Sequence, residues 1–217
     1  MFLTAWLGAT LSFFDGSPKM PLHPVPDRNP VLIVHGIADS ARNMSWLARY
    51  LQCQGWEVHT LSLKPNWAQK GIEPLAAQVD AYAREQFGER RFDLVGFSMG
   101  GLVSRYYVQR LGGLDRVDHL VTLSAPHNGT VMANLVPNRG CREMRPNSPF
   151  LRDLAQDADK LQQLKFTSLY TLMDLVIIPQ RSSEMPQATN IRMPVLAHPF
   201  MVIDKLCLRT VADALRG

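Results

Sequence analysis

The sequence predicts an α/β domain whose centre is a mostly parallel sheet of about six strands, flanked by helices. Short apolar runs alternate with amphipathic helical patterns from residue 30 to the end of the chain. Alternation of this kind is typical of parallel sheets with right-handed crossover connections. The 217 residues, 46% of them hydrophobic, are enough for one domain with a sizeable core. We therefore expect one domain over residues 30–217, preceded by a separate segment, residues 1–29.

Residues 1–29 combine an apolar stretch with a proline-rich stretch. Residues 2–14 are apolar and uncharged, but too few to span a bilayer. No Lys or Arg precedes them and no clean small-x-small cleavage site follows, which favours a packed or membrane-touching segment over a signal peptide. Residues 17–30 carry five prolines and predict an extended linker.

The cysteines and the charge limit the location and the partners that we expect. Cys53, Cys141 and Cys207 lie far apart, and their odd number favours a reducing compartment, although one disulfide plus one free thiol stays open. We expect a cytoplasmic protein, with membrane association through residues 2–14 or secretion as alternatives. No Cys or His spacing indicates a metal site. The net charge of +4 comes without a basic cluster, so we expect no nucleic-acid partner.

Two strands and two helices are expected in the first ninety residues. The strands are residues 30–34 and 56–63. Asn43 is expected to cap the first helix and Gly55 to end it, and Pro74 is expected to begin the second. The apolar residues of the two helices are Trp46, Leu47, Tyr50 and Leu51, and then Leu75, Val79, Tyr82 and Phe87.

Residues 92–111, FDLVGFSMGGLVSRYYVQRL, contain the most informative motif of the chain. A buried strand leads through Gly96-Phe97-Ser98-Met99-Gly100 into a pattern with helical spacing. A strand that enters a helix through Gly-x-Ser-x-Gly is a nucleophile elbow. The turn is tight, so the flanking glycines are needed, and the hydroxyl projects above the free N–H groups of the following helix. The motif predicts that Ser98 is a nucleophile.

The second half of the chain continues the alternation. We expect strands over residues 117–124, 167–173 and 191–196, and a helix opened by Ser148 and Pro149 that runs to about Leu164. Residues 125–147 are expected to be irregular. The final helix is expected over residues 199–215, with its inward face formed by Phe200, Ile203, Leu206 and Val211.

Asp174 and His198 are the expected partners of Ser98. A serine nucleophile needs a base and a carboxylate that orients the base. In chains with this elbow the acid and then the histidine follow the serine, and both lie at the carboxyl ends of strands. Asp174 and His198 satisfy both conditions, and Pro199 keeps His198 on a loop. His127 is the rival base, but it precedes Asp174, so we expect it to form a wall of the site.

The remaining polar candidates have simpler roles. His59 and His119 fall within strands and are expected to be structural, and Asp157 and Asp159 are expected on a solvated helix face. The oxyanion of a tetrahedral intermediate needs two backbone N–H donors, one after the nucleophile and one after the first core strand. These would be Met99 and Ile37.

The motifs together resemble those of the α/β-hydrolase superfamily, in particular the lipase and esterase group and its small bacterial members without a large cap. PVLIVHGI resembles the oxyanion segment of that group and VGFSMGGLVSRYYV its elbow. SAPHNGT resembles a segment of many lipases, and MDLVIIP the loop of the acid. The resemblance covers about residues 30–215. One position departs from it, because the histidine of the family usually follows glycine and here Ala197 precedes His198.

The resemblance implies an enzyme that hydrolyses carboxylic esters or lipids through an acyl-enzyme on Ser98, without a metal or an organic cofactor. Thioester hydrolysis and lipid acyl transfer use the same machinery and stay open. A non-catalytic binding module would lack a member of the triad, and none is missing. We expect residues 126–149 to cover the site as a lid, with Val131, Met132 and Leu135 against the acyl chain. The alternative for this segment is a packed connector.

Overall fold

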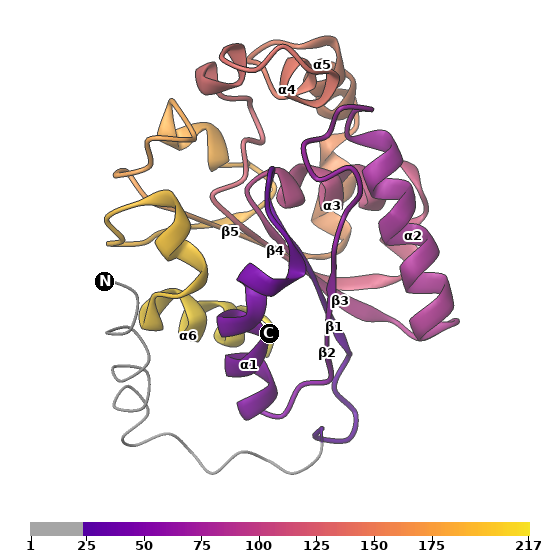
Figure 1. Cartoon of the computed structure of the whole chain (residues 1–217). Helices are drawn as coiled ribbons and strands as arrows, with labels where there is room; N and C mark the ends of the chain where they lie inside the picture. The colour runs from indigo at the N-terminus through magenta and orange to yellow at the C-terminus, as the bar shows by residue number, and fades with distance from the viewer. Residues whose placement is uncertain (1–23) are drawn as a thin grey trace, which may run out of the picture.

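A six-stranded parallel sheet forms the centre of the protein in a computed structural model that describes residues 24–217. The strand order is β2-β1-β3-β4-β5-β6, and every neighbouring pair is parallel (Figure 1). The predicted number and direction of strands are confirmed. The strands are β1 (Val31–Val34), β2 (Val58–Leu61), β3 (Phe92–Phe97), β4 (Val117–Leu123), β5 (Lys165–Tyr170) and β6 (Thr189–Arg192).

Helices cover both faces of the sheet (Figure 1). The helices α1 (Ser45–Cys53) and α6 (Lys205–Ala214) pack on one face, and α2 (Glu73–Phe87) and α3 (Met99–Arg110) on the other. Two shorter helices, α4 (Arg139–Glu143) and α5 (Pro149–Gln156), follow β4. Six 3-10 turns complete the described chain: η1 (Ala41–Met44), η2 (Gly113–Asp115), η3 (Val131–Asn134), η4 (Ala158–Gln163), η5 (Gln180–Ser183) and η6 (His198–Val202).

The sheet separates two hydrophobic cores because successive side chains of a strand point to opposite faces. Leu32 and Val34 of β1 pack in the core beneath α2 and α3, whereas Val31 and Ile33 pack in the core beneath α1 and α6. All four side chains are fully buried. A strand with both faces covered reads as a continuous apolar run, which is why VLIV predicted it.

The expected helix boundaries hold for α2 but not for the start of α1. Pro74 lies in the first turn of α2, where its missing N–H costs nothing. Asn43 does not cap α1: it lies inside η1 and its amide donates to Asp39, and α1 begins at Ser45 with Met44 at the cap position. Gly55 follows the end of α1 with a φ of 93°, a conformation that favours glycine.

The segment expected to be irregular contains two short helical elements. Thr130 caps η3 and Asn138 caps α4, and the side chain of each accepts a backbone N–H. The helix α5 opens at Ser148 and Pro149 as predicted, but it ends at Gln156 rather than near Leu164, and η4 follows.

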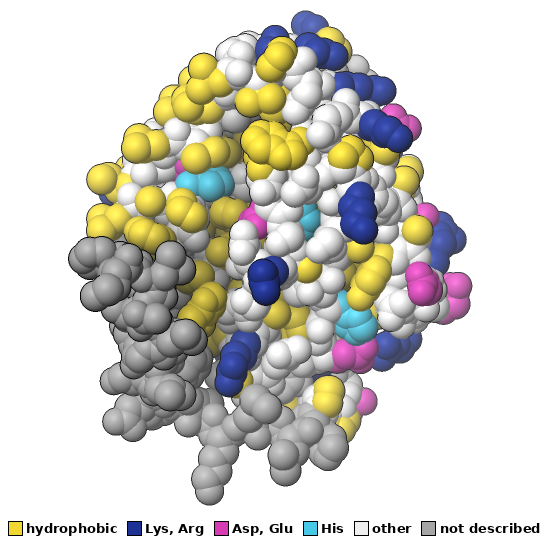
Figure 2. All heavy atoms as spheres, viewed as in Figure 1, with side chains coloured by type: hydrophobic (Ala, Val, Ile, Leu, Met, Phe, Trp, Pro, Cys, Tyr) yellow, Lys and Arg dark blue, Asp and Glu magenta, His cyan; other side chains and the backbone are white. Residues whose placement is uncertain are grey.

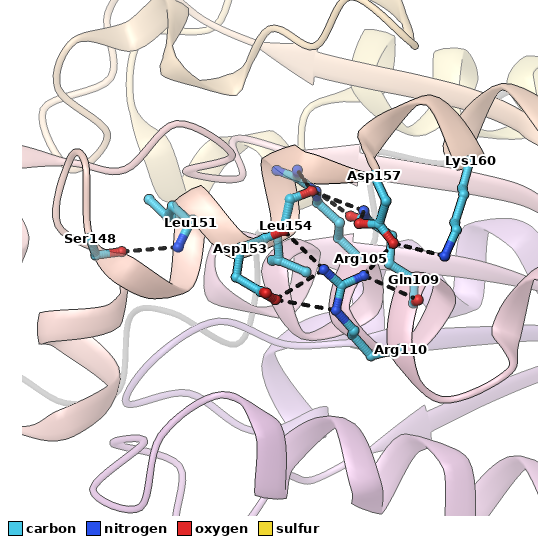
Figure 3. Close-up of polar contacts among 9 residues, drawn as sticks. All are labelled: Arg105, Gln109, Arg110, Ser148, Leu151, Asp153, Leu154, Asp157 and Lys160. Atoms are coloured by element: carbon cyan, nitrogen blue, oxygen red, sulfur yellow. Dashed lines mark hydrogen bonds and ion pairs between the residues drawn. The ribbon is translucent and has the colours of Figure 1, made fainter.

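An ion-pair network joins α3 to α5 and corrects the expectation for Asp157 (Figure 3). Arg110 pairs with Asp153 at 2.9 Å and with Asp157 at 2.6 Å. Asp157 also pairs with Lys160 and accepts from Gln109, so it is not a simple solvated residue. Asp159, in contrast, only accepts from the neutral amide of Gln187 among the described residues.

The last two strands and the final helix differ from the prediction in extent. β5 and β6 end three and four residues earlier than expected, so Asp174 lies on the loop beyond β5 and His198 is the first residue of η6, beyond β6. The expected final helix is split, because Asp204 accepts from two N–H groups and caps α6 separately from η6. The two elements have separate buried faces, with Met201 and Val202 buried in η6 and Cys207, Leu208 and Val211 in α6. Of the four residues expected to face inward, Val211 is buried and the other three are exposed, Phe200, Ile203 and Leu206.

Other expectations fall partly outside the described residues. Residues 2–14 lie outside them, as does the first half of the expected linker, residues 17–23. The last residues of that linker contact the domain, since the N–H of Val25 donates to Gly55 and Arg28 stacks on Trp56. His59 bonds Glu57 and Tyr82, and His119 bonds Asp93. Within residues 24–217, no helix combines the length and hydropathy needed to cross a membrane.

Candidate active site

Ser98 lies at a sharp turn between β3 and α3 and is almost fully buried. Its backbone has a φ of 54° and a ψ of −125°, a combination that non-glycine residues rarely adopt and that costs of order 1–3 kcal/mol. A side-chain carbon on Gly96 would lie 2.6 Å from Cα of Gly101, and one on Gly100 would overlap the carbonyl oxygen of Val34. The predicted strand-turn-helix context is therefore confirmed, and the flanking glycines are required by close approach.

The loop after β1 lies against Ser98. A side-chain carbon on Gly36 would lie 3.0 Å from Cβ of Ser98 and 3.5 Å from its Oγ. The backbone N–H groups of Ile37 and Met99 have no hydrogen-bond partner within residues 24–217. Met99 is the first residue of α3, where N–H groups are normally free and the helix dipole is positive. Two unpaired donors thus come from the two segments that meet at the serine.

His35 fixes the loop after β1 through two hydrogen bonds of its buried ring. The N–H of Leu63 donates to Nε2 of His35 at 2.9 Å, and Nδ1 lies 2.7 Å from the carbonyl oxygen of Gly36. Since a backbone N–H can only donate, Nε2 carries no proton and Nδ1 is the donor to Gly36. The role of the His35 side chain was not predicted, since the motif indicates only main-chain groups in this segment.

Asp174, on the loop after β5, and His198, at the start of η6, form a buried pair. Nδ1 of His198 lies 2.7 Å from Oδ2 of Asp174, and both side chains are less than a tenth exposed. The other oxygen, Oδ1, accepts from the N–H groups of Val176 and Ile177, each at 2.8 Å. Burial acts to raise the pKa of Asp174, but the bonds from His198, Ile177 and Val176 outweigh it, and the pKa is lowered. The aspartate is therefore held as a carboxylate.

The His198 ring packs beside the elbow. Its centroid lies 4.8 Å from that of Phe97, the residue before Ser98, with the two rings tilted by 37°. In the described part of the chain no hydrogen bond joins His198 to Ser98. Such bonds are often long in the absence of substrate. The structure thus joins the predicted acid and base directly, and brings the base to the neighbour of the predicted nucleophile.

His127 lies elsewhere, with its ring in the interior. The ring is 1% exposed, and its Nε2 lies 3.0 Å from the hydroxyl of Thr122. Burial, with a smaller contribution from the charge of Arg105, lowers the pKa of His127 well below its ordinary value. The residue borders a cavity of about 330 Å³ that none of Ser98, Asp174 and His198 lines. This burial corrects the expectation that His127 forms a wall of the site.

Exposed apolar side chains lie within two residues of Asp174 or His198 along the chain. We call these five residues the apolar rim: Met173, Leu175, Val176, Leu196 and Phe200, each between 40% and 74% exposed. Figure 2 shows hydrophobic side chains gathered at the upper left of the molecule, over the orange and yellow segments of Figure 1. In the expected lid, Val131 and Leu135 are exposed and Met132 is half-buried. They are therefore available for contact with a ligand.

Metal-ligating and thiol groups are dispersed. Among residues 24–217, no three His, Cys, Asp or Glu side chains lie close enough to hold a metal ion together. The three cysteines, all within this range, carry free thiols.

The fold is that of solved lipases. Bacillus licheniformis lipase BlEst2 in its mature form superposes with a TM-score of 0.73 and 20% identity, covering 92% of this chain and 96% of that one. Aspergillus fumigatus lipase B gives a TM-score of 0.76 and 19% identity, with 90% of this chain and 56% of that one covered. The α/β-hydrolase fold expected from the motifs is confirmed.

Sequence comparisons give the family. A triacylglycerol lipase of Pseudarthrobacter phenanthrenivorans is 31% identical over 118 residues, which cover 50% of this chain and 36% of the lipase. The chain spans about a third of the length of the curated relatives it matches. The family model for palmitoyl protein thioesterases matches residues 30–171, a range that includes the elbow and ends before Asp174. The chain therefore belongs to the palmitoyl protein thioesterase family of α/β-hydrolases.

Proposed function

We propose that this protein hydrolyses carboxylic esters through an acyl-enzyme formed on Ser98, with His198 as general base and Asp174 as the orienting acid. The observation that carries the proposal is the Asp174–His198 pair packed beside the strained elbow that holds Ser98. Family membership and the lipase relatives support the same reaction class.

The tautomer of His198 supports the assignment of roles. Asp174 is held as a carboxylate and can only accept, so Nδ1 of His198 carries a proton. Nε2 is then the nitrogen left to take the serine proton as the hydroxyl attacks the acyl carbon. The same proton passes to the leaving alcohol, and water next hydrolyses the acyl-enzyme with His198 again as base.

The N–H groups of Ile37 and Met99 are proposed to hold the oxyanion. Both are unpaired within residues 24–217 and come from the segments that meet at Ser98. Preorganised donors of this kind each contribute about 10²–10³ to kcat in acyl transfer. Because both are main-chain groups, side-chain substitutions at these positions need not abolish activity.

The apolar surface near the proposed triad favours a substrate with an extended acyl chain. The apolar rim and the exposed side chains of Val131 and Leu135 offer apolar surface near the proposed triad. Burial of acyl carbons against such surface is favourable by roughly 0.8 kcal/mol per methylene. We therefore propose lipid or fatty acyl esters as the substrate class.

Thioesters are a second candidate, favoured by the family to which the chain belongs. A thioester has the same acyl carbon and needs the same nucleophile, base and oxyanion donors. Only the leaving group differs, since a thiolate leaves more readily than an alkoxide. The site residues therefore serve either substrate, and the choice between them depends on measured rates.

The proposal is tested with p-nitrophenyl esters from C2 to C16 and with acyl thioesters of the same chain lengths. Ser98→Ala should lower both activities by several orders of magnitude while the fold is retained. A fluorophosphonate probe should label the wild type at Ser98 and leave the variant unlabelled. Equal hydrolysis or equal labelling by folded Ser98→Ala protein would contradict the assignment.

A further inference from the structure

The hydroxyl of Thr130 is fully engaged in hydrogen bonds to the loop that carries Asp174. Oγ1 donates to the carbonyl oxygen of Val176 at 2.7 Å and accepts from the N–H of Ile178 at 3.0 Å. It also accepts, at 3.3 Å, from the N–H of Met132 at the start of η3. Thr130 is 5% exposed, so these bonds are shielded from water. One donor and two acceptor positions are the full capacity of a hydroxyl.

The groups that Thr130 holds adjoin those that hold Asp174. The N–H groups of Val176 and Ile177 donate to Oδ1 of the aspartate, and Thr130 fixes the carbonyl of Val176 and the N–H of Ile178. The N–H of Val131 adds a bond to the carbonyl of Ile178 at 2.9 Å. The peptide between Val176 and Ile177 therefore has its carbonyl on Thr130 and its N–H on Asp174, and it is planar, so fixing one end orients the other.

The backbone around Thr130 makes further hydrogen bonds. Its N–H donates to the carbonyl of Met144 at 2.9 Å. The neighbouring Gly129 accepts from the hydroxyl of Ser182, and Asn128 bonds the backbone of Ser182. The threonine is thus a rigid support for the loop that carries the acid.

We propose that Thr130 is a positioning residue for the reaction: it fixes the Val176–Ile177 peptide and thereby orients Asp174 and, through Asp174, His198. The inference rests on the proposed function of that pair. It also gives a physical role to the last residue of SAPHNGT, whose pattern is otherwise only a point of resemblance.

Thr130→Val separates the hydroxyl from the shape of the side chain. Valine keeps the volume but leaves the Val176 carbonyl and the Ile178 N–H without their partner, and a buried polar group left unpaired is destabilising. The loop should loosen and the imidazole should lose its fixed orientation. Since small misplacements of reacting groups cost about 10²-fold, we expect kcat to fall by about ten- to a hundred-fold with KM nearly unchanged. Thr130→Ser, which restores the hydroxyl, should recover most of kcat.

Ser148→Ala is the matched control. Ser148 is 6% exposed, and its hydroxyl donates to the carbonyl of Glu143 and accepts from the N–H of Leu151, so its loss also leaves two backbone groups unpaired. These groups belong to α4 and α5 rather than to the acid loop. The control should lose stability as Thr130→Val does, yet retain wild-type kcat.

Hydrogen exchange supplies a readout that does not depend on activity. Amides 176–178 should exchange faster in Thr130→Val than in wild type or Ser148→Ala, and Thr130→Ser should restore their protection. The proposal is overturned if folded Thr130→Val keeps the kcat of Ser148→Ala, or if serine fails to rescue it. Failure of the proposed function would look different, because wild type itself would then lack Ser98-dependent hydrolysis.

Discussion

At the scale of single residues, the His35 side chain bears most directly on the proposed oxyanion site. Its Nδ1–H donates to the carbonyl of Gly36, and its Nε2 accepts from Leu63 near the end of β2. The Gly36–Ile37 peptide is planar and trans, so a fixed carbonyl directs the Ile37 N–H to the opposite side. His35 therefore holds a proposed oxyanion donor in place without contacting the substrate.

His35→Phe should lower kcat while changing KM little. Phenylalanine keeps a ring of similar size but removes both hydrogen bonds, so the Gly36–Ile37 peptide is free to rotate away. Deleting an oxyanion donor costs about 10²–10³ in kcat, and a donor that is only misoriented should cost less, about ten- to a hundred-fold. Steady-state kinetics on the best ester of the series measures the effect.

His59→Phe is the control for this change. His59 lies on β2 and its substitution also removes two hydrogen bonds, but these go to Glu57 and Tyr82 and not to the loop after β1. Its kcat should equal that of wild type. An equal loss of kcat in both variants would show that the effect of His35 is one of general stability.

The site residues that the sequence could propose are those marked by a local motif or by their order in the chain. Ser98 is proposed from its flanking glycines, and Asp174 and His198 from their order and their positions after strands. His35 and Thr130 act on backbone groups 28 to 48 residues away. Nearly every residue carries the same backbone N–H and carbonyl groups. The sequence pattern therefore does not show which backbone group a given side chain will bind. His127 was misassigned because its position after a strand does not indicate on which side the ring is buried.

At the scale of elements, η3 and the residue after it form the part of the expected lid that is available to a ligand. Val131 and Leu135 are 45% and 72% exposed, while the N–H of Val131 ties the segment to the acid loop. Exposed apolar side chains on a tethered backbone suit contact with an acyl chain. A packed connector would bury them instead.

Replacing Val131, Met132 and Leu135 with serine should lower the hydrolysis of long-chain esters much more than that of acetate esters. The substitutions remove apolar surface but keep the backbone hydrogen bonds, so the proposed triad and oxyanion donors are retained. With roughly 0.8 kcal/mol for each methylene left without apolar contact, kcat/KM for a C16 ester should fall by about ten-fold or more. Rates for the C2 ester should stay near wild type.

Leu206→Ser tests whether any loss of exposed apolar surface has this effect. Leu206 is 47% exposed and lies on α6. The Leu206→Ser variant should show the same dependence of kcat/KM on acyl chain length as wild type. A uniform loss across all chain lengths in the triple variant, with the fold intact, would indicate that the segment supports the site rather than contacts the acyl chain.

The order of elements followed from the sequence, whereas several boundaries and one helix face did not. Burial on both sides makes the central strands continuous apolar runs, and these are visible without a structure. The face of the last helix was wrong because one helical period was applied across two separate elements: η6 buries Met201 and Val202, and α6, capped anew by Asp204, buries Cys207 and Leu208. Such a break depends on whether a side chain accepts the following N–H groups, which periodicity does not reveal.

At the scale of the whole molecule, the parallel sheet gathers the proposed site at one edge, and the α3–α5 network secures the helix that begins at Ser98. Arg105 is buried and donates to the carbonyl oxygens of His127 and Leu154 (Figure 3 shows the latter region). Burial lowers the pKa of Arg105 to about 10, with the charge of Asp157 opposing this. The network therefore links the elbow helix to the segment after β4 and to α5.

The Asp157 carboxylate makes this network sensitive to acid. Burial acts to raise its pKa, but bonds from Arg110 and Lys160 prevail and lower the pKa from 3.8 to about 2. A carboxylate with a lower pKa in the folded state stabilises the fold above the pKa of the unfolded chain, and this contribution is lost as pH falls through the folded value. The free energy of unfolding should therefore fall as pH is lowered from about 4 to about 2, in part because of Asp157.

Asp157→Asn should make the free energy of unfolding depend less on pH between about 4 and about 2. Asparagine keeps the shape and can still accept from Gln109, but it has no charge to lose, so its stability should be lower than that of wild type near neutral pH and should approach it in acid. Urea unfolding across this pH range measures both effects. Asp159→Asn is the control, because Asp159 bonds only a neutral amide among the described residues, and it should keep the wild-type slope. If Asp157→Asn and wild type lose stability in parallel, the network does not confer acid sensitivity, and other carboxylates must account for it.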